Sequence, residues 1–516
     1  MTNASRSFGV GISPEEPVTL PLKSDRATQM STMTTTMNES RRDARGCFPD
    51  ATLCGPKPSH VLCLYPYVKE VPIYEFFPPI GLEYVATAVS DMVESIRIVD
   101  ARYVKDPMSY FGPSVDTALV SVNWNYSYDE VCSVIRQIPS HVRVIVGGRQ
   151  ATDYVEDLFL RCPNISIIVR GEGEATMRDL FSGRPLEEVK GISYVDDGKV
   201  IHNEARPLLS VNDAISPDRA LRTTTYRATI RGIDLGVSFD AVMSSRGCPY
   251  KCKFCTFKLN PLGQLRKWEA RSPESTVEEI EALDAEFVAF VDDNFAADMN
   301  RVESICDLII SRGIKKMFLC NVRIDIARQP ALLKKMRKAG FKVLMVGLES
   351  AQDKSLVAMQ KGFKTDGVRD AFKVLARSGM LINGYFIIGI IGEDEDEMLM
   401  MSQYASEIGL DFISLNRLRW EKFSPLEDIV KENAGYYIGQ DNGIYSERYG
   451  RKELTAILKR IHRKFYTPGH VMQILAKALK LGVFTPQRLL TLLCYVPYIL
   501  IKTHASKRRL KKMMKR

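Results

Sequence analysis

Three cysteines within eight residues constrain this chain more than any other feature of its sequence. Cys248, Cys252 and Cys255 have a C-x3-C-x2-C spacing in the stretch SRGCPYKCKFCTF. Three thiolates on one short loop can bind three irons of a cubane iron–sulfur cluster, because such clusters take cysteine ligands from tight, turn-rich segments. Gly247 and Pro249 allow the backbone to bend around a cluster. No fourth cysteine lies nearby, so one iron would stay open for a small molecule.

The same three cysteines are also compatible with a zinc site or with unrelated core thiols. A zinc site normally requires four protein ligands that close a tetrahedron. Alternatively, the three thiols belong to the core and their spacing has no function. The next cysteines, Cys306 and Cys320, each lie in an apolar pattern of their own. We favour the cluster and expect Cys248, Cys252 and Cys255 to be its ligands.

Length and composition indicate an ordinary globular protein with several domains. A chain of 516 residues is long enough for about three domains, and 45% hydrophobic and 26% charged residues are typical values. The eleven cysteines show no paired spacing, which predicts a reducing, cytoplasmic environment rather than a disulfide framework. Residues 1–57 are rich in Ser, Thr and Met, show no signal-peptide pattern, and are expected to be disordered because they bury too little apolar surface.

Residues 58–210 have the pattern of a doubly wound parallel α/β sheet. Short apolar runs that begin near positions 60, 96, 117, 142 and 165 alternate with helical stretches near positions 78, 128 and 153. Ligands of such sheets bind beyond the carboxyl ends of the strands. At these ends the sequence has NWN at 123–125, Gly147-Gly148 and RGEGE at 170–174. The turn-rich stretch 206–217 is the predicted linker to the next domain.

Residues 225–440 continue as repeated strands and helices, the pattern of a partial α/β barrel. Strand-like runs that begin near positions 287, 317, 343, 382 and 411 end in polar residues. In parallel barrels, polar residues at the carboxyl ends of strands form the active site. The candidates are Asp293, Arg323, Glu349 and Ser350. A carboxylate can hold an ammonium group or ribose hydroxyls, and an arginine a carboxylate. For Ser350 we favour the alternative, a cap of the following helix.

The cysteine spacing after a strand resembles the radical S-adenosylmethionine enzymes, and DDNF, GLES and GYFIIG at successive strands are similar to their partial (β/α)6 barrel. PPIGL, VGG and RGEGE resemble the Rossmann-like cobalamin-binding domain fused to many of these enzymes, so the resemblance covers about residues 58–425. It implies a 4Fe–4S cluster whose open iron chelates S-adenosylmethionine and whose electron cleaves it to methionine and a 5′-deoxyadenosyl radical. It also implies cofactor contacts from Asp293, Arg323, Glu349, Ser350, Gly147, Gly148, Gly171 and Glu172.

Two departures from the family pattern affect the expected function. The chain has no Asp-x-His-x-x-Gly motif, so bound cobalamin is expected without a histidine ligand on cobalt. After the sixth strand, RLRWEKFSPL replaces the proline- and glycine-rich loop of many relatives, and substrate choice is expected to depend on that stretch.

The resemblance implies a cobalamin-dependent methylase that acts on an unactivated carbon of an apolar, lipid- or terpenoid-like substrate, as hopanoid methylases do. An electron donor such as flavodoxin or ferredoxin is implied as a partner, and nucleic acid is not. The alternatives are an oxidative cyclase like the anaerobic tetrapyrrole ring-forming enzymes, and a non-catalytic sensor of cobalamin or of the cluster.

Residues 441–516 are expected to form a helical segment with a membrane-associating tail. The apolar run 489–501 has 13 residues, too few to span a bilayer, and Pro497 interrupts it. Eight Lys and Arg residues follow between positions 502 and 516, in a chain whose net charge is +9. An apolar helix before a polybasic end is the pattern of a peripheral anchor on the inner face of the cytoplasmic membrane. A helix packed on the barrel with a solvated tail is the alternative; RNA binding lacks an aromatic-interleaved basic surface.

Overall fold

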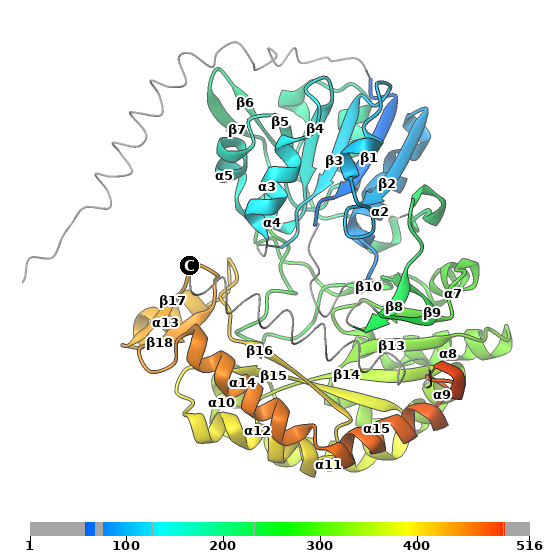
Figure 1. Ribbon diagram of the computed structural model, residues 1–516, viewed down its shortest axis with the longest axis vertical. Helices are drawn as coiled ribbons and strands as arrows, with labels where there is room; N and C mark the ends of the chain where they lie inside the picture. The colour runs from blue at the N-terminus through cyan, green and yellow to red at the C-terminus, as the bar shows by residue number, and fades with distance from the viewer. Residues whose placement is uncertain are drawn as a thin grey trace, which may run out of the picture. The chain divides into compact units, whose positions relative to one another are not determined.

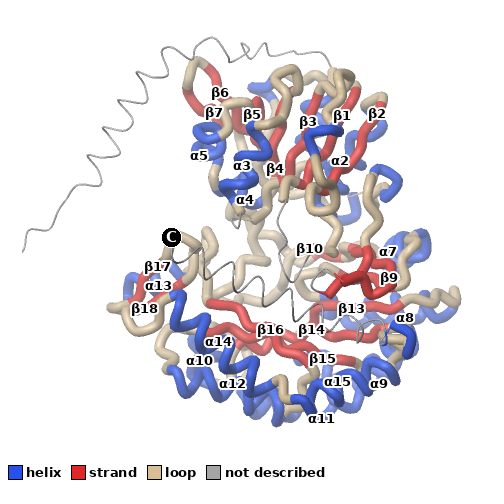
Figure 2. The backbone as a smooth tube through the Cα atoms, viewed as in Figure 1, coloured by secondary structure: helices blue, strands red, loops and turns tan. Residues whose placement is uncertain are grey.

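The computed structural model describes residues 57–67, 76–124, 127–213, 215–230, 233–488 and 490, all within one unit that spans residues 53–516. Two seven-stranded sheets follow one another along the chain (Figure 1, Figure 2). The segment 1–57, predicted to be disordered, lies outside the described residues except at Lys57. The apolar run and basic tail, 489–516, lie outside them except at Leu490.

The first sheet confirms the parallel pattern predicted for the first part of the chain. Its strand order β2-β1-β3-β4-β5 reverses direction between β1 and β3, the point at which such sheets bind ligands. Cys63, Leu64 and Val99 are completely buried, as expected for strands covered on both faces. The parallel strands are β1 (His60–Tyr65), β2 (Ser95–Asp100), β3 (Thr117–Ser121), β4 (Arg143–Gly147) and β5 (Ile165–Val169).

An antiparallel hairpin, β6 (Ile192–Asp196) and β7 (Lys199–His202), extends this sheet beyond β5 and is an addition to the predicted pattern. Asp197 and Gly198 connect the two strands with φ values of 42° and 72°. Both central residues of a type I′ turn need this left-handed conformation, and Asp-Gly between apolar runs is its sequence signal.

Helices cover both faces of the first sheet. Right-handed connections from β1 to β2 and from β3 to β4 run in opposite directions, so α2 and α3 cover opposite faces. α2 packs against α6, and α3 contacts α5 through a hydrogen bond of 2.8 Å from the Tyr128 hydroxyl to Asp157 Oδ2. These helices are α2 (Ile80–Val89), α3 (Tyr128–Arg136), α4 (Arg149–Asp153), α5 (Val155–Arg161) and α6 (Glu174–Phe181).

The second sheet contains six parallel strands in the order β9-β12-β13-β14-β15-β16, which confirms the predicted partial barrel. An unpredicted strand, β8, pairs antiparallel with β9 at one edge. Phe290, Phe318 and Phe341 form the centre of its core, with ring centroids 5.2–5.8 Å apart. The strands are β8 (Arg227–Ile230), β9 (Ile233–Val242), β12 (Phe287–Phe290), β13 (Met317–Val322), β14 (Phe341–Glu349), β15 (Leu381–Ile388) and β16 (Phe412–Arg417).

Helices connect the parallel strands of the second sheet, and Figure 1 shows them along its outer side. Gly340 ends α9 with a φ of 111°, and a Cβ atom there would collide with the carbonyl oxygen of Lys316. Only glycine fits this turn without displacing backbone. The helices are α7 (Pro273–Ala282), α8 (Met299–Ser311), α9 (Pro330–Ala339), α10 (Asp353–Ala358), α11 (Thr365–Leu375) and α12 (Glu395–Glu407).

The described part of the C-terminal segment packs on the second sheet. The predicted helical segment contains α14 (Arg451–Phe465) and α15 (Pro468–Lys480), and α14 packs against α12. α13 (Leu426–Glu432) and a hairpin of β17 (Tyr436–Ile438) and β18 (Ile444–Ser446) precede them. This hairpin pairs residues on both sides of position 440, where the helical segment was predicted to begin.

None of the helices in the described ranges has the length and apolar character required to cross a membrane.

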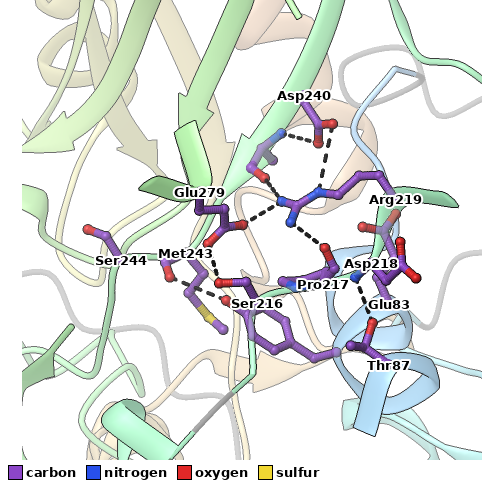
Figure 3. A network of polar contacts seen from close by, with 12 residues as sticks. Glu83, Thr87, Ser216, Pro217, Asp218, Arg219, Asp240, Met243, Ser244 and Glu279 are labelled. Carbon is purple, nitrogen blue, oxygen red and sulfur yellow. Dashed lines mark hydrogen bonds and ion pairs between the residues drawn. The ribbon is translucent and has the colours of Figure 1, made fainter. Parts of the chain in front are cut away.

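Ion pairs hold the linker between the two sheets (Figure 3). The Arg222 guanidinium donates to both carboxylate oxygens of Glu83 in α2, at 2.7 and 2.8 Å, and to Asp240 in β9, at 2.8 and 2.9 Å. Arg219 lies 2.6 Å from Glu279 in α7. Glu83 is fully buried, and a buried carboxylate requires such a partner. The linker therefore binds elements of both sheets through charge.

Candidate functional site

A loop at the carboxyl end of β9 carries the three cysteines. β10 (Ser245–Arg246) and β11 (Glu269–Ala270) pair antiparallel and close the base of this loop. Cys252 is buried, whereas Cys248 and Cys255 are partly exposed. Burial raises the pKa of the Cys255 thiol to about 12, and the neighbouring Cys252 and Cys248 also raise it. The three thiols are thus neighbours on one loop, and metal binding would favour the thiolate form of Cys255.

The described residues contain no group of three or more His, Cys, Asp or Glu side chains that is compact enough for a single metal ion. In a cubane cluster each thiolate binds a different iron, so its ligands stand farther apart than those of one ion. The donor set of Cys248, Cys252 and Cys255 suits a cluster with one open iron.

Two adjacent aspartates after β12 hold the start of the cysteine loop. Asp292 is completely buried, and its carboxylate accepts hydrogen bonds from Ser244 N and Oγ, at 2.7 and 2.8 Å, and from Ser245 N. Asp293 Oδ2 accepts a hydrogen bond of 3.0 Å from Gly247 N. Burial raises the pKa of Asp293 to about 7. Asp293 therefore lies at the predicted site and binds the loop backbone, while its contact with a cofactor stays a prediction.

Arg323 also contacts the cysteine loop. Its guanidinium lies over the Tyr250 ring, 3.7 Å from the centroid, and Nη1 is 3.9 Å from Cys252 Sγ. Nε donates to Asp325 at 3.2 Å, and Nη2 donates to the Lys361 carbonyl at 2.8 Å. The sequence correctly placed Arg323 at this edge, but several of its donors already have protein partners.

Glu349 and Ser350 lie at the end of β14. Glu349 has a left-handed φ of 71°, which is strained for a residue with a Cβ, and its carboxylate lies 2.7 Å from the buried Lys361 ammonium. Ser350 donates a hydrogen bond of 2.7 Å to Glu393 Oε1. Ser355 donates to the same oxygen at 2.8 Å. Strain at a sheet edge beside a buried ion pair is typical of a binding site.

Sequence reasoning missed Lys361 and Glu393. Lys361 follows α10 and has no strand-end position to mark it. Glu393 follows the predicted strand that ends in GIIG, so its place one residue beyond that run was the available signal. Burial raises the pKa of Glu393 to about 7.

Gly147 ends β4 at the carboxyl edge of the first sheet, and Gly148 follows it. Gly148 has a φ of 111°, and a Cβ atom there would lie 2.6 Å from Asn123 Oδ1 and from the Val122 carbonyl oxygen. Asn123 Oδ1 accepts a hydrogen bond of 3.1 Å from Arg149 N. The glycine turn thus packs directly on the loop after β3, and the protein itself already requires Gly148.

The loop after β3 presents an exposed aromatic side chain at the same edge. The buried Tyr67 hydroxyl accepts hydrogen bonds of 2.9 and 2.8 Å from Asn123 N and Trp124 N, which fixes the loop. Trp124 remains 48% exposed. None of the described histidines is in the loops after β3, β4 or β5. Glycine backbone and an aromatic surface without imidazole suit a planar corrinoid whose cobalt takes no histidine ligand.

Gly171 and Glu172 follow β5. Gly171 has a φ of 79°, and a Cβ atom there would lie 3.1 Å from Leu262 of the cysteine loop. Glu172 Oε1 forms an ion pair with Arg266 of that loop, and Glu172 Oε2 accepts a hydrogen bond of 2.9 Å from Leu209 N. Both predicted cofactor residues therefore contact the protein chain, and their contact with a cofactor stays a prediction.

Arg149 joins both predicted sites, and sequence reasoning missed it. It is the residue after Gly148, and its Nη2 donates to Thr256 Oγ1 at 2.9 Å and to Glu421 Oε2 at 2.8 Å. Thr256 follows Cys255, and Glu421 belongs to the loop after β16 that was predicted to select the substrate. Arg149 therefore connects the first sheet, the cysteine loop and the predicted substrate loop.

Large apolar side chains are exposed on the two loops that Arg149 contacts. Phe257 is 50% exposed and Leu265 is 61% exposed, both on the cysteine loop. Phe423, in the loop after β16, is 48% exposed and lies against Gly263, where a Cβ atom would be 3.0 Å from its ring. Together with Trp124, these side chains could contact a small apolar molecule.

Comparison with known proteins gives a family match over the second sheet. The model of the radical SAM superfamily matches residues 242–405. The chain is 28% identical over 425 residues to the uncharacterized methyltransferase PH0819 of Pyrococcus horikoshii, covering 77% of this chain and 89% of that protein. It is 26% identical over 291 residues to the anaerobic magnesium-protoporphyrin IX monomethyl ester cyclase of Cereibacter sphaeroides. That alignment covers 53% of this chain and 46% of the cyclase, so the chain spans about half of its length.

A solved structure with both predicted kinds of domain has a similar fold. It is the radical S-adenosylmethionine methyltransferase TsrM of Kitasatospora setae with cobalamin and a 4Fe–4S cluster bound. The TM-score is 0.60 at 16% sequence identity, over 80% of this chain and 86% of that chain. This likeness concerns the fold and supports the two-sheet architecture described above.

Proposed function

We propose that the chain is a radical S-adenosylmethionine enzyme with a cobalamin-type domain, and that it methylates an unactivated carbon of a small apolar substrate. The observation that carries this proposal is the contact of Arg149 with Thr256. Through it, the glycine turn predicted to bind a corrinoid meets the loop predicted to bind a cluster. A radical methylase needs these two chemistries side by side.

The chain's own residues have separate tasks in this reaction. Cys248, Cys252 and Cys255 hold the cluster, which when bound supplies one electron to S-adenosylmethionine. Asp292 and Asp293 keep the cysteine loop in place through its backbone N–H groups. The Arg323 guanidinium after β13 and the Glu349 carboxylate at the end of β14 would orient the polar end of S-adenosylmethionine.

The first sheet would bind the corrinoid that donates the methyl group. Gly147 and Gly148 would let the ligand approach the backbone, and the exposed Trp124 would offer it a flat apolar surface. The corrinoid would have no histidine from the loops after β3, β4 and β5, because their described residues include none.

An apolar substrate is supported by the exposed side chains around Arg149. Phe257, Leu265 and Phe423 are about half or more exposed, and removing such side chains from water is favourable. The hydrophobic effect would therefore hold a lipid- or terpenoid-like molecule between the cysteine loop and the loop after β16. A small reducing protein such as flavodoxin or ferredoxin would supply the electron.

The second candidate function is oxidative ring formation without methyl transfer. The similarity to the anaerobic magnesium-protoporphyrin IX monomethyl ester cyclase favours it, although that alignment covers 53% of this chain. The two functions share the cluster and the cleavage of S-adenosylmethionine. They differ in the fate of the methyl group.

Labelled S-adenosylmethionine separates the two functions. Anaerobically purified protein with a reconstituted cluster and hydroxocobalamin would receive a reductant, S-adenosylmethionine with a deuterated methyl group, and a lipid extract from the producing cells. Mass spectrometry should find 5′-deoxyadenosine and a lipid that carries the labelled methyl group. A product that has lost hydrogen and gained no label would instead support the cyclase.

The Cys252→Ala variant is the control for this experiment. It should form neither 5′-deoxyadenosine nor labelled product, because the cluster loses one of its three ligands. Cys63→Ala, which removes a buried thiol from the first sheet, should keep both activities at a level set by its stability. Full activity in Cys252→Ala would contradict the assignment of the cluster.

A further inference from the structure

Four charged side chains connect the base of the cysteine loop to the loop after β5. Arg246 precedes Cys248, Arg266 follows Cys255, Glu172 lies in the loop after β5, and Glu174 begins α6. We call these four residues the loop clamp. Their side chains are between 6% and 20% exposed, so water screens the charges poorly.

In the loop clamp, arginines at both ends of the cysteine loop pair with the two glutamates that follow β5. Arg246 Nη2 lies 2.6 Å from Glu174 Oε1, and Arg246 Nη1 lies 3.5 Å from Glu172 Oε1. Arg266 pairs with the same Glu172 oxygen, and its Nη1 donates to the Leu209 carbonyl at 2.8 Å. Both ends of the cysteine loop are therefore tied to one short segment of the first sheet.

The carboxylate of Glu172 has protein partners on both oxygens. Oε1 faces Arg266 and Arg246, and Oε2 accepts the hydrogen bond from Leu209 N. A carboxylate in such a network loses its partners if it turns towards a ligand, and leaving a buried guanidinium unpaired is costly. Glu172 is consequently better suited to hold the cysteine loop than to bind a corrinoid.

Apolar packing reinforces the same contact. Leu262 lies close to Gly171, where an added Cβ atom would be 3.1 Å from its side chain. Leu262 belongs to the turn of the cysteine loop between Leu259 and Leu265, which form a β-bridge. Gln264 also donates to the Arg206 carbonyl in the linker at 3.1 Å. The loop after β5 thus cannot shift without moving the cysteine loop.

We propose that the loop clamp couples corrinoid binding on the first sheet to cluster binding on the cysteine loop, with Glu172 as a positioning residue rather than a corrinoid ligand. The inference rests on the proposed function, because it needs a corrinoid over the strand ends. A corrinoid that orders the loop after β5 also orders the cysteine loop, so each cofactor strengthens binding of the other. The same clamp sets the separation of the two cofactors.

The test measures the dissociation constant of hydroxocobalamin for the full-length chain with and without the reconstituted cluster. In the wild type, the cluster should lower this constant at least about fivefold, within the usual range of coupling between sites. We call the dissociation constant without the cluster divided by that with the cluster the coupling ratio. In Glu172→Gln and in Arg266→Gln, the coupling ratio should fall to near one, while the dissociation constant of the cluster-free chain stays near the wild-type value. Arg266 lies on the cysteine loop, so its effect on cobalamin must pass through the clamp.

Three further variants serve as controls for this measurement. Glu188→Gln removes an exposed carboxylate from the first half of the chain and should keep the wild-type ratio. Arg266→Lys keeps the charge, and its coupling ratio should lie between that of the wild type and that of Arg266→Gln. Glu174→Gln, which touches only Arg246 in the clamp, replaces Glu172→Gln if that variant loses iron or does not fold.

Each outcome has one meaning. If Glu172→Gln loses the same affinity for hydroxocobalamin with the cluster and without it, Glu172 is a direct ligand and the proposal is overturned. A wild-type ratio of one would also overturn it, while the proposed function would stand. Failure of the wild type to bind hydroxocobalamin in either form would remove the proposed function itself, and the inference with it.

Discussion

The guanidinium of Arg323 is directed at a predicted cluster ligand, since Nη1 lies 3.9 Å from Cys252 Sγ. Hydrogen bonds to cluster sulfurs change the reduction potential, and a positive charge stabilises the added electron. We expect Arg323→Gln to lower the reduction potential of the bound cluster, measured by anaerobic spectroelectrochemistry at equal iron content. Arg328→Gln, whose side chain is 81% exposed, is the matched control and should leave the potential unchanged. Equal potentials in all three proteins would contradict this role for Arg323.

The buried carboxyl of Glu393 should make stability depend on pH. Burial raises its pKa to about 7, whereas an unfolded glutamate titrates at about 4.3. The native state therefore holds a proton that the unfolded state releases, and the stabilisation present below about pH 4.3 is lost as the pH rises to about 7. The free energy of unfolding should fall over this range by at most about 1.4 kcal/mol per pH unit from this group.

Urea unfolding at several pH values between 4.5 and 7.5 tests the role of Glu393. The Glu393→Gln variant should lose less stability over this range than the wild type does. Glu432→Gln changes an exposed glutamate at the end of α13 and should behave as the wild type. Parallel pH curves for the wild type and Glu393→Gln would refute the raised pKa.

At the scale of elements, the turn from α9 into β14 depends on Gly340. A Cβ atom there would meet backbone rather than a flexible side chain, and its φ of 111° is rarely adopted by other residues. We expect Gly340→Ala to reduce the free energy of unfolding by about 1–3 kcal/mol. Gly367→Ala, within α11 and with no atom within 4 Å of its added Cβ, should instead increase stability by up to about 1 kcal/mol. Chemical unfolding of both variants checks the contrast, and equal effects would rule out the proposed cause.

The strands could be predicted from the sequence better than the contacts of the site. Continuous apolar runs identify buried strands wherever they occur, so β5 and most strands of the barrel were found close to their observed ends. The strand β8 and the hairpin of β6 and β7 were missed. For the hairpin, the Asp197-Gly198 signal was present but was not used.

Side-chain partners at the site could not be predicted, because they depend on tertiary packing. Asp293 was expected to hold a cofactor, yet its observed partner is Gly247 N, 46 positions away. Arg266 and Glu172 are 94 positions apart and belong to different sheets. A strand pattern places such residues at an edge of a sheet, but it contains no information about which of them pair.

For the whole molecule, the predicted membrane tail leads to a test by vesicle flotation. Residues 489–516 combine an apolar run with eight basic residues, and basic residues contribute about 1 kcal/mol each near an anionic surface. Full-length protein should float with anionic vesicles, less so as salt rises, because the charges are screened within about 8 Å at physiological salt. A chain that ends at residue 488 should stay in the soluble fraction and still bind the cluster. Equal flotation of the two proteins would remove the support for a membrane role.

The ion pair between Glu83 and Arg222 also imposes an order on biosynthesis. The two residues are 139 positions apart, so at about 5–20 residues per second the ribosome adds Arg222 roughly 7–28 s after Glu83. Until then α2 carries a carboxylate without the guanidinium that allows its complete burial. Nascent chains that stop before residue 222 should consequently be cut by proteases near α2 more readily than chains extended beyond Asp240. The first sheet is thus expected to finish folding only after the linker and the first strands of the second sheet have been made.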